Sequence, residues 1–164
     1  MSQSSFLIRE IKPEDNQDIE VLIHEVFTEF EIPMTGSSIE DDDVSNMSEA
    51  YSDPRASYFV IERQGKVLGG AGIKQLQGAE EHICELQKMY FSKEIRGLGY
   101  GKKMFDLCME SARSLGYTQC YLESASQLKA AIHMYEKNGF IRLDKPMGET
   151  GHYVCGVWMV KELI

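Results

Sequence analysis

A glycine-rich turn is the segment of this sequence whose residue types point most directly to chemistry. It reads Arg96-Gly97-Leu98-Gly99-Tyr100-Gly101-Lys102 and stands between an apolar segment and an amphipathic one. Three alternate glycines let a backbone turn sharply and approach a ligand closely. A helix that follows such a turn offers unpaired N–H groups and the positive end of its dipole. The turn therefore predicts an anion site, and phosphate is the anion we expect there.

Two common phosphate-binding motifs fit this turn poorly. A Walker A loop has four residues between its glycines and a hydroxyl residue after its lysine, whereas three residues separate Gly97 from Gly101. Lys103, and not a hydroxyl residue, follows Lys102. The dinucleotide fingerprint needs a third glycine where Lys102 stands, and it follows the first strand of a parallel sheet. Glu123, at the end of a later strand, is the one feature that favours a dinucleotide, which stays the second choice.

Glu85 is the carboxylate that the sequence places in an apolar segment, His82–Phe91, which we expect to be a strand. Desolvation in such a strand raises the pKa of a carboxyl group toward a value useful for proton transfer near neutral pH. The structural alternative is a strand-end carboxylate paired with a lysine or an arginine. Glu85 is therefore a candidate base for any reaction at the anion site.

Composition bounds the size and location of the protein. The chain has 164 residues, 43% of them apolar, so we expect residues 1–164 to form a single domain with its own core. No run is long and apolar enough to span a bilayer, and Met1–Phe6 is too short and polar for a signal peptide. The sequence thus predicts a cytoplasmic protein that has no membrane partner.

Cysteine use and charge argue against other classes of site. The cysteines lie at irregular spacing in apolar segments without a Cys-x-x-Cys pair, which predicts neither disulfides nor a metal; they are Cys84, Cys108, Cys120 and Cys155. Asp and Glu number 26 against 17 Lys and Arg. This balance disfavours a nucleic-acid partner and mildly favours a cationic partner or substrate.

The elements that must position these residues follow from the hydrophobic pattern. Helical spacing runs from Ile19 to Phe30 and from Met104 to Leu115, and a third helix ends at Gly139. We interpret the polar stretch Thr35–Arg55 as a surface lobe holding a short helix. The expected strands are Phe6–Glu10, Ser57–Glu62, Val67–Gln75, His82–Phe91, Thr118–Glu123, Phe140–Asp144 and Tyr153–Lys161. The order β-α-(α)-β-β-β-α-β-α-β-β predicts an α/β (α+β) fold, a mixed sheet covered by helices.

In this setting the glycine turn resembles the acetyl-CoA pyrophosphate loop of the GCN5-related N-acetyltransferase (GNAT) superfamily. The matching pattern is Arg-x-x-Gly-x-Gly, here Arg96, Gly99 and Gly101. Glu85–Phe91 resembles the family's splayed fourth strand, and Ala131–Phe140 resembles its later helix, which ends in Tyr-Glu-Lys-x-Gly-Phe. The resemblance covers nearly the whole chain. It implies a mixed, mostly antiparallel sheet of six to seven strands, splayed between strands 4 and 5 and flanked by about four helices.

The resemblance implies an enzyme, an N-acetyltransferase that moves an acetyl group from acetyl-CoA to a primary amine by direct attack in a ternary complex. It implies that amides of the turn hold the coenzyme pyrophosphate and that main-chain groups of the fourth strand pair with the pantetheine arm. The residues expected to bind the coenzyme are Met89, Phe91, Arg96, Gly97, Leu98, Gly99, Tyr100, Gly101 and Lys102. Arg96 either positions the turn or touches phosphate.

Three groups are expected to carry the chemistry. An amine acceptor arrives mostly protonated, so a base is needed, and Glu85 has the offset from Arg96 that the catalytic glutamate has in the histone-acetylating branch of the superfamily. It acts directly or through a water. The Met89 N–H is expected to face the thioester oxygen, a contribution of about 3–4 kcal/mol. Tyr135 lies where the family places a tyrosine hydroxyl beside the coenzyme sulfur, so it is assigned as the acid; the alternative is a packed ring with its hydroxyl at the sheet edge.

Several features stay open at this stage. Leu128 stands where many family members carry an asparagine that touches the pantetheine. A contact of His152 with the acceptor is a hypothesis, and the acidic run Glu40–Asp43 is either a cation site or a solvated loop. The acceptor is expected to be a small-molecule amine or a peptide, and an exposed edge on the last strand suggests a homodimer. The alternative function is a non-catalytic acyl-CoA-binding sensor or interaction module.

Overall fold

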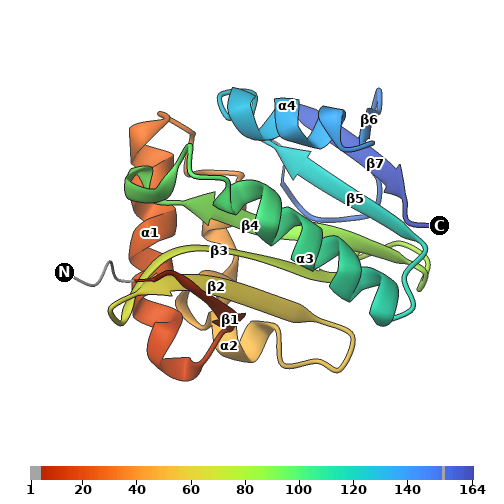
Figure 1. The fold of residues 1–164 in the computed structure, drawn as a ribbon. Helices are drawn as coiled ribbons and strands as arrows, with labels where there is room; N and C mark the ends of the chain where they lie inside the picture. The colour runs from red at the N-terminus through yellow and green to blue at the C-terminus, as the bar shows by residue number, and fades with distance from the viewer. Residues whose placement is uncertain (1–4, 153) are drawn as a thin grey trace.

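The computed structural model describes residues 5–152 and 154–164, and in it one twisted sheet of seven strands lies between two layers of helices (Figure 1). The strand order is β1-β2-β3-β4-β5-β7-β6, and only the β4–β5 pair is parallel. The strands are β1 (Leu7–Glu10), β2 (Ser57–Arg63), β3 (Lys66–Gln75), β4 (Ile83–Phe91), β5 (Gln119–Ser124), β6 (Ile141–Arg142) and β7 (Val157–Glu162). The expected fold class is confirmed, including its mixed, mostly antiparallel sheet.

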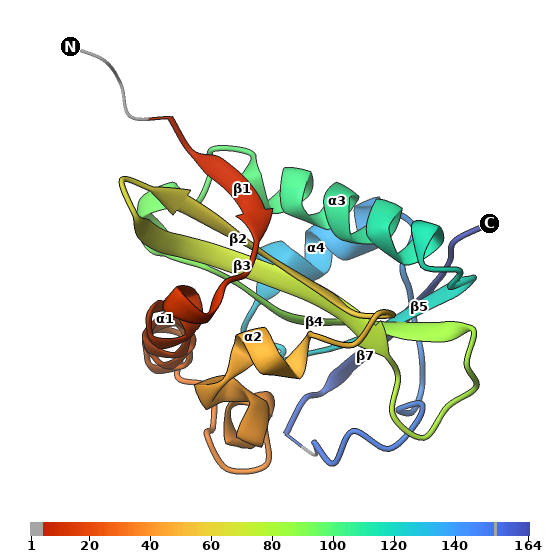
Figure 2. The same cartoon turned by 90° about the horizontal axis from the view of Figure 1, so that it is seen from below.

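In the part of the chain that the structure describes, four α-helices cover the sheet, two on each face (Figure 2). α1 (Asn16–Glu29) and the short α2 (Met47–Ala50) lie on one face, and α3 (Tyr100–Ser114) and α4 (Lys129–Lys137) lie on the other. The apolar residues at helical spacing are the ones that become buried, for example Ile19, Leu22 and Ile23 in α1. The sheet therefore separates the two main parts of the hydrophobic core, and a smaller third cluster forms around Leu76, Ile83 and Tyr121.

The sheet splits between β4 and β5. Their parallel pairing extends only from Ile83 opposite Gln119 to Glu85 opposite Tyr121. Beyond Glu85, β4 continues to Phe91 along β3, and β5 continues to Ser124 along β7, so the two strands diverge. In the described chain, the side of β4 that faces away from β3 has no strand beside it beyond Glu85. This opening is where the expected splay between strands 4 and 5 lies.

A β-bulge at Lys88 changes which face the side chains of β4 occupy. Lys88 has a positive φ of 48°, and the register with β3 shifts between Gly70 and Gly72. Before the bulge, Cys84 and Leu86 pack on the α3 and α4 face; after it, Met89 and Phe91 do. Simple alternation would send Lys88 to that face as well. The bulge instead turns Lys88 to the opposite face, the one occupied by Glu85 and Gln87, and Tyr58 fixes it by donating a hydrogen bond to its carbonyl at 2.7 Å.

Three details of the sequence-based prediction need correction. The strand expected at Phe140–Asp144 is reduced to Ile141–Arg142, and the last strand begins at Val157, not at Tyr153, which lies outside the described residues. The glycines and proline of the 144–156 segment explain the short pairing, since they favour turns. The last strand is also not the sheet edge, because β6 pairs with it at Met159 and Val160.

The stretch 35–55 is more than a surface lobe. Its two 3-10 turns, Ser38–Glu40 and Asp42–Ser45, and α2 insert apolar side chains into the core part under α1. Ile39, Val44 and Met47 are all buried. The polar composition of the stretch hid this packing, because a few apolar residues at short spacing suffice to anchor it. We call residues 37–51 the lobe below.

Within residues 5–152 and 154–164, no helix is long and apolar enough to cross a bilayer. The same residues hold no group of three or more His, Cys, Asp or Glu side chains arranged to bind a metal ion.

Candidate active site

The glycine turn leads from β4 into α3 in a conformation that requires glycine. Ser92 caps the 3-10 turn Lys93–Ile95 by accepting a hydrogen bond from the Glu94 N–H at 3.3 Å. Gly97 and Gly99 then adopt φ values of 78° and 87°, which L side chains rarely adopt. A Cβ built at either position meets nothing within 4 Å. The glycines are therefore needed for backbone conformation, and the space over the turn is open to a ligand.

Arg96 fixes the turn to the end of α1. Its guanidinium donates to both carboxylate oxygens of Glu29, at 2.6 and 3.0 Å, and to the Phe91 carbonyl at 2.8 and 3.0 Å. It also stacks 4.9 Å above the ring centroid of Phe30. These contacts occupy one face of the guanidinium and most of its N–H donors. Of the two roles left open by the sequence, the structure provides the contacts for positioning the turn.

The other residues of the turn divide between packing and exposure. Tyr100 stacks on Phe6 at a centroid distance of 4.7 Å, which fixes the start of α3. Lys102 pairs with Asp106 one turn further along the helix. Leu98 is 56% exposed at the tip of the turn. Leu98 and Lys102 thus lie at the surface, where they can border a ligand without being needed for the core.

An apolar groove of about 240 Å³ runs from the glycine turn along the open edge of β4. α4 forms its opposite wall, so the groove lies in the split of the sheet. Its lining includes every expected binding residue on β4 and two glycines of the turn; the residues are Val26, Phe30, Met89, Tyr90, Phe91, Ile95, Arg96, Gly97, Gly101, Leu128, Lys129, Ala130, Ala131 and Met134. The structure brings together an anion-binding turn and an extended apolar channel.

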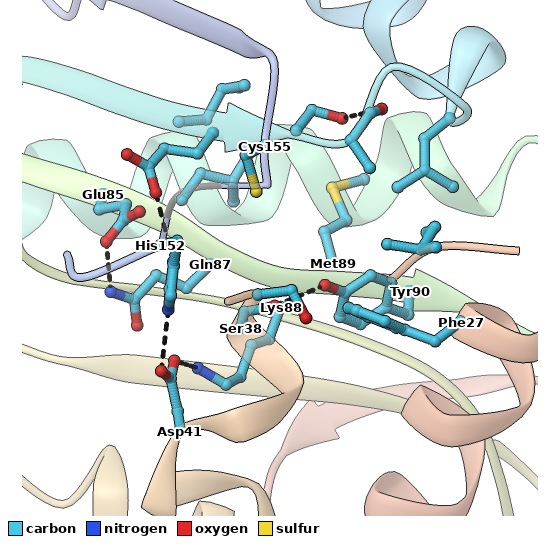
Figure 3. A pocket seen from close by; sticks show the side chains of 18 of the residues that line it. Phe27, Ser38, Asp41, Glu85, Gln87, Lys88, Met89, Tyr90, His152 and Cys155 are labelled. Atoms are coloured by element: carbon cyan, nitrogen blue, oxygen red, sulfur yellow. Dashed lines mark hydrogen bonds and ion pairs between the residues drawn. The ribbon is translucent and has the colours of Figure 1, made fainter. Parts of the chain in front are cut away.

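A polar cavity adjoins the inner end of this groove (Figure 3). Met89, Tyr90 and Leu128 line both spaces and so mark where they meet. Leu128 also occupies the N-cap of α4, where its side chain offers no hydrogen bond to the helix. Glu85 and His152 lie at the other end of the cavity. The apolar groove and the polar cavity therefore meet beside Met89.

Only 6% of the surface of Glu85 is exposed, yet its side chain lines this cavity. Burial raises the pKa of its carboxyl to about 7, opposed by a hydrogen bond at 2.6 Å from Gln87. The nearby charge of Glu123 raises it further, while those of His152 and Lys88 lower it. Gln87 is itself fixed, since Tyr51 donates to its carbonyl oxygen at 2.7 Å. A carboxyl group with this pKa exchanges its proton readily at neutral pH.

Tyr135 reaches the same region from α4. Its ring is buried against Phe105 and Phe140, with centroid distances of 6.2 and 5.9 Å, as the packing alternative expects. Its hydroxyl donates to Sδ of Met89 at 3.6 Å. Burial raises the pKa of the phenol, so the group keeps its proton over the physiological range. The hydroxyl therefore points across the split of the sheet toward β4.

The polar cavity also contains a cluster of charged side chains that the sequence did not predict. His152 bridges two carboxylates, with Nε2 2.8 Å from Oδ1 of Asp41 and Nδ1 3.3 Å from Oε1 of Glu123 (Figure 3). Lys88 donates to the other oxygen of Asp41 at 2.8 Å. Asp41 is thus half-buried and paired on both oxygens, and the exposed Glu40 accepts a hydrogen bond from the Gly36 N–H. The run Glu40–Asp43 is thus not uniform, because Glu40 and Asp42 are exposed while Asp41 takes part in the charge cluster.

The signals for these residues are visible only in retrospect. Lys88 is a charged residue within an apolar strand, and its side chain is only 3% exposed. Glu123 lies one residue before the end of β5, and the sequence offers it only as a feature that favours a dinucleotide. Lys88 and Glu123 face the cavity because of the bulge in β4 and the divergence of β4 from β5. The local sequence pattern reveals neither feature. Cys155 lines the cavity as well, and burial raises the pKa of its thiol to about 12, so it stays a thiol.

The chain was compared with known protein families. A family model described as the Acetyltransferase (GNAT) family matches residues 22–140, which span the lobe, β2 to β5, α3 and α4. The chain belongs to the GNAT family. The expected relationship to the superfamily is thereby confirmed, and with it an acyltransferase activity.

Individual GNAT relatives agree in sequence and fold. The chain is 41% identical over 164 residues to the uncharacterized N-acetyltransferase YjgM of Escherichia coli K12, covering 99% of this chain and 98% of that protein. A GNAT acetyltransferase from Staphylococcus aureus Mu50 superimposes with a TM-score of 0.86 at 20% identity, covering 98% and 100% of the two chains. The structure of yncA from Salmonella typhimurium with its cofactor acetyl-CoA superimposes with a TM-score of 0.74 at 19% identity, covering 97% and 94%.

The groove of this GNAT protein suits a coenzyme A molecule. An open turn with two left-handed glycines at the start of a 15-residue helix provides for a pyrophosphate. The unpaired edge of β4 and the apolar wall of α4 provide for an extended arm that ends beside Met89 and Tyr135. The residues present thus fit the chemistry of the group, with backbone N–H groups for its phosphates and apolar side chains for its arm.

Proposed function

We propose that this GNAT protein transfers an acetyl group from acetyl-CoA to a primary amine of a small molecule or a peptide. The observation that carries the proposal is the position of Glu85, a buried carboxyl with a pKa of about 7, in a cavity continuous with the coenzyme groove. The two substrates would enter from opposite ends and meet past Met89. Such an arrangement favours direct transfer in a ternary complex, since proximity alone can supply several kcal/mol of the barrier reduction.

Glu85 is proposed as the base. An acceptor ammonium has a pKa near about 10, so a proton must leave before the nitrogen can attack. Glu85, directly or through one water, takes that proton, and its pKa near neutrality is suited to the task. The new C–N bond then forms as the thioester C–S bond breaks. Bound acetyl-CoA would supply the activated acyl group for this step.

Met89 and Tyr135 are proposed to act on the two ends of the thioester. The Met89 N–H lies just after the bulge on the open part of β4, where a backbone donor can stabilise negative charge on the thioester oxygen. The Tyr135 hydroxyl, directed toward Met89, is proposed to give its proton to the departing thiolate. Its raised pKa keeps the proton available. The second proton that the nitrogen loses as the amide forms would restore the Tyr135 hydroxyl. The backbone of residues 97–102 would hold the pyrophosphate.

Release of free thiol from acetyl-CoA tests the proposal. A panel of amines, including polyamines, amino acids, aminoglycosides and short peptides, would be offered to the wild-type protein and to Glu85→Gln. We expect turnover with at least one amine and a loss of about 100-fold in kcat for Glu85→Gln. Glu81→Gln, an exposed carboxylate just before β4, is the matched control and should turn over normally. Tight coenzyme binding without turnover on any acceptor would instead indicate the acyl-CoA sensor.

A further inference from the structure

The charge cluster beside Glu85 joins three segments that are distant in the chain. His152 lies in the segment between β6 and β7, Asp41 in the lobe, and Glu123 at the end of β5. The side chains of His152 and Glu123 are 13% and 3% exposed, so both are largely removed from water. Ion pairs at this depth are screened little by solvent. The cluster therefore exerts a substantial field on any titratable group nearby.

The geometry fixes the charge of His152. Each ring nitrogen faces a carboxylate oxygen, and an ionised carboxylate only accepts hydrogen bonds. Both nitrogens must carry protons to satisfy both contacts, so the ring is an imidazolium. In agreement, the hydrogen bonds that the ring donates to Asp41 and Glu123 raise the pKa of His152 to about 9. The ring thus holds its positive charge throughout the pH range in which Glu85 titrates.

The segment that carries His152 is held in place by this contact and by its neighbours. Thr150 donates to Glu123 at 2.8 Å, and the Met147 N–H donates to the Tyr121 hydroxyl at 3.2 Å. Tyr121 donates in turn to the second oxygen of Glu123 at 2.6 Å. The link from His152 to Asp41 connects this segment to the lobe on the other side of the cavity. His152 is consequently positioned from both sides and cannot turn away without breaking an ion pair.

We propose that His152 is a positioning residue for catalysis. As an imidazolium fixed between Asp41 and Glu123, it holds the walls of the polar cavity together and keeps Glu85 able to release its proton near neutral pH. This inference rests on the proposed role of Glu85 as base. The charged and titratable groups that face Glu85 or His152 come from every element around the cavity. They are Glu85, Lys88 and Tyr90 on β4, Tyr121 and Glu123 on β5, Tyr135 on α4, Lys74 on β3, Glu40, Asp41, Asp42, Asp43 and Tyr51 in the lobe, and Cys155 between β6 and β7.

The balance of these charges explains the effect. Glu123 is negative and opposes ionisation of Glu85, whereas Lys88 and His152 are positive and favour it. Lys88 is shared with Asp41, which is negative, so its field is partly cancelled. Removing the charge of His152 would leave Glu85 facing an excess of carboxylates. Glu85 would then keep its proton to higher pH and act as a base only in more alkaline solution.

The test compares pH profiles of kcat/KM for wild type, His152→Gln and His152→Lys with an acceptor found in the amine panel. For His152→Gln we expect the midpoint of the acidic limb to move upward, so that at pH 6.5 the rate falls about three- to tenfold more than at pH 9. His152→Lys restores a cation and should return the midpoint toward the wild-type value. His24→Gln on the exposed face of α1 is the matched control. An unchanged midpoint in His152→Gln would overturn the inference.

A second measurement separates this inference from the proposed function. The carboxyl carbon of Glu85 can be followed by NMR titration in the full chain without any turnover. An upward shift of its pKa in His152→Gln supports the electrostatic role even if Glu85→Gln proves active and Glu85 is not the base. A Glu85 titration that is the same in wild type and His152→Gln contradicts the inference whatever the base proves to be.

Discussion

The hydroxyl of Tyr135 on α4 donates a hydrogen bond to Sδ of Met89 on β4, 3.6 Å away across the split of the sheet. This contact connects the two walls of the groove at the point where it meets the polar cavity. A thioether is a weak hydrogen-bond acceptor, so the hydroxyl loses only a weak hydrogen bond when it turns to a better acceptor. The side chain is thus directed by its packing toward the place proposed for the coenzyme sulfur.

Replacement of Tyr135 by Phe should lower kcat about 10- to 100-fold and leave the Kd for acetyl-CoA nearly unchanged. The ring packing against Phe105 and Phe140 is retained, and only the proton donor is lost. Steady-state thiol release and isothermal titration calorimetry measure the two quantities. Tyr117→Phe removes a hydroxyl that donates to the Arg55 carbonyl far from the groove, and it should keep full activity. Equal kcat values for Tyr135→Phe and wild type would rule out the acid role.

The rate should rise with pH through a midpoint near 7. Glu85 accepts a proton only when ionised, and burial raises the pKa of its carboxyl to about 7. The expected profile of kcat/KM therefore falls about tenfold for each pH unit well below 7 and levels off above 8. Initial rates between pH 5 and 9 measure it, with Glu81→Gln as the control. A profile without an acidic limb near 7 would contradict the assignment of Glu85.

The same pKa predicts a cost in stability. The carboxyl of Glu85 binds its proton more tightly in the folded state, where its pKa is about 7, than at the ordinary value of 4.5. Its contribution to stability is therefore fully present below pH 4.5 and is lost as the pH rises through 7. Glu85→Gln should accordingly raise the free energy of unfolding by about 2 kcal/mol at pH 8.5 and change it little at pH 5. Urea unfolding at both pH values provides the measurement, and an equal effect at the two values would refute the linkage.

The fold was largely predictable because the local patterns agree with one another. Helical spacing in α1 and α3 and the glycine turn before α3 identify elements that form for local reasons. The order of the elements then leaves few topologies. The pattern was less informative at 35–55, where a few buried side chains such as Ile39 and Val44 anchor a polar segment. Their packing partners lie far away in the chain, so no local signal marks them.

The site was predictable where one segment carries it and not where several segments meet. The glycine turn and the side chains of Glu85 and Tyr135 belong to continuous motifs. The cluster of Asp41 and His152 depends on a contact between residues 111 positions apart. Lys88 joins it only because the bulge in β4 changes the face of one residue. A β-bulge is set by the pairing of two strands, and alternation along one strand does not reveal it.

The glycine turn allows the backbone requirement to be separated from coenzyme binding. Gly99 and Gly116 have φ values of 87° and 90°, and a Cβ built on either meets nothing within 4 Å. Alanine at either position should thus cost about 1 kcal/mol in the free energy of unfolding, purely through the left-handed backbone. Gly116 ends α3 at the far end from the turn, whereas Gly99 is its N-cap. Gly99→Ala should therefore also raise the Kd for coenzyme A about tenfold or more, measured by calorimetry, while Gly116→Ala leaves it unchanged. If Gly99→Ala and Gly116→Ala both bound coenzyme A as tightly as wild type, the glycine turn would not be the binding site of the pyrophosphate.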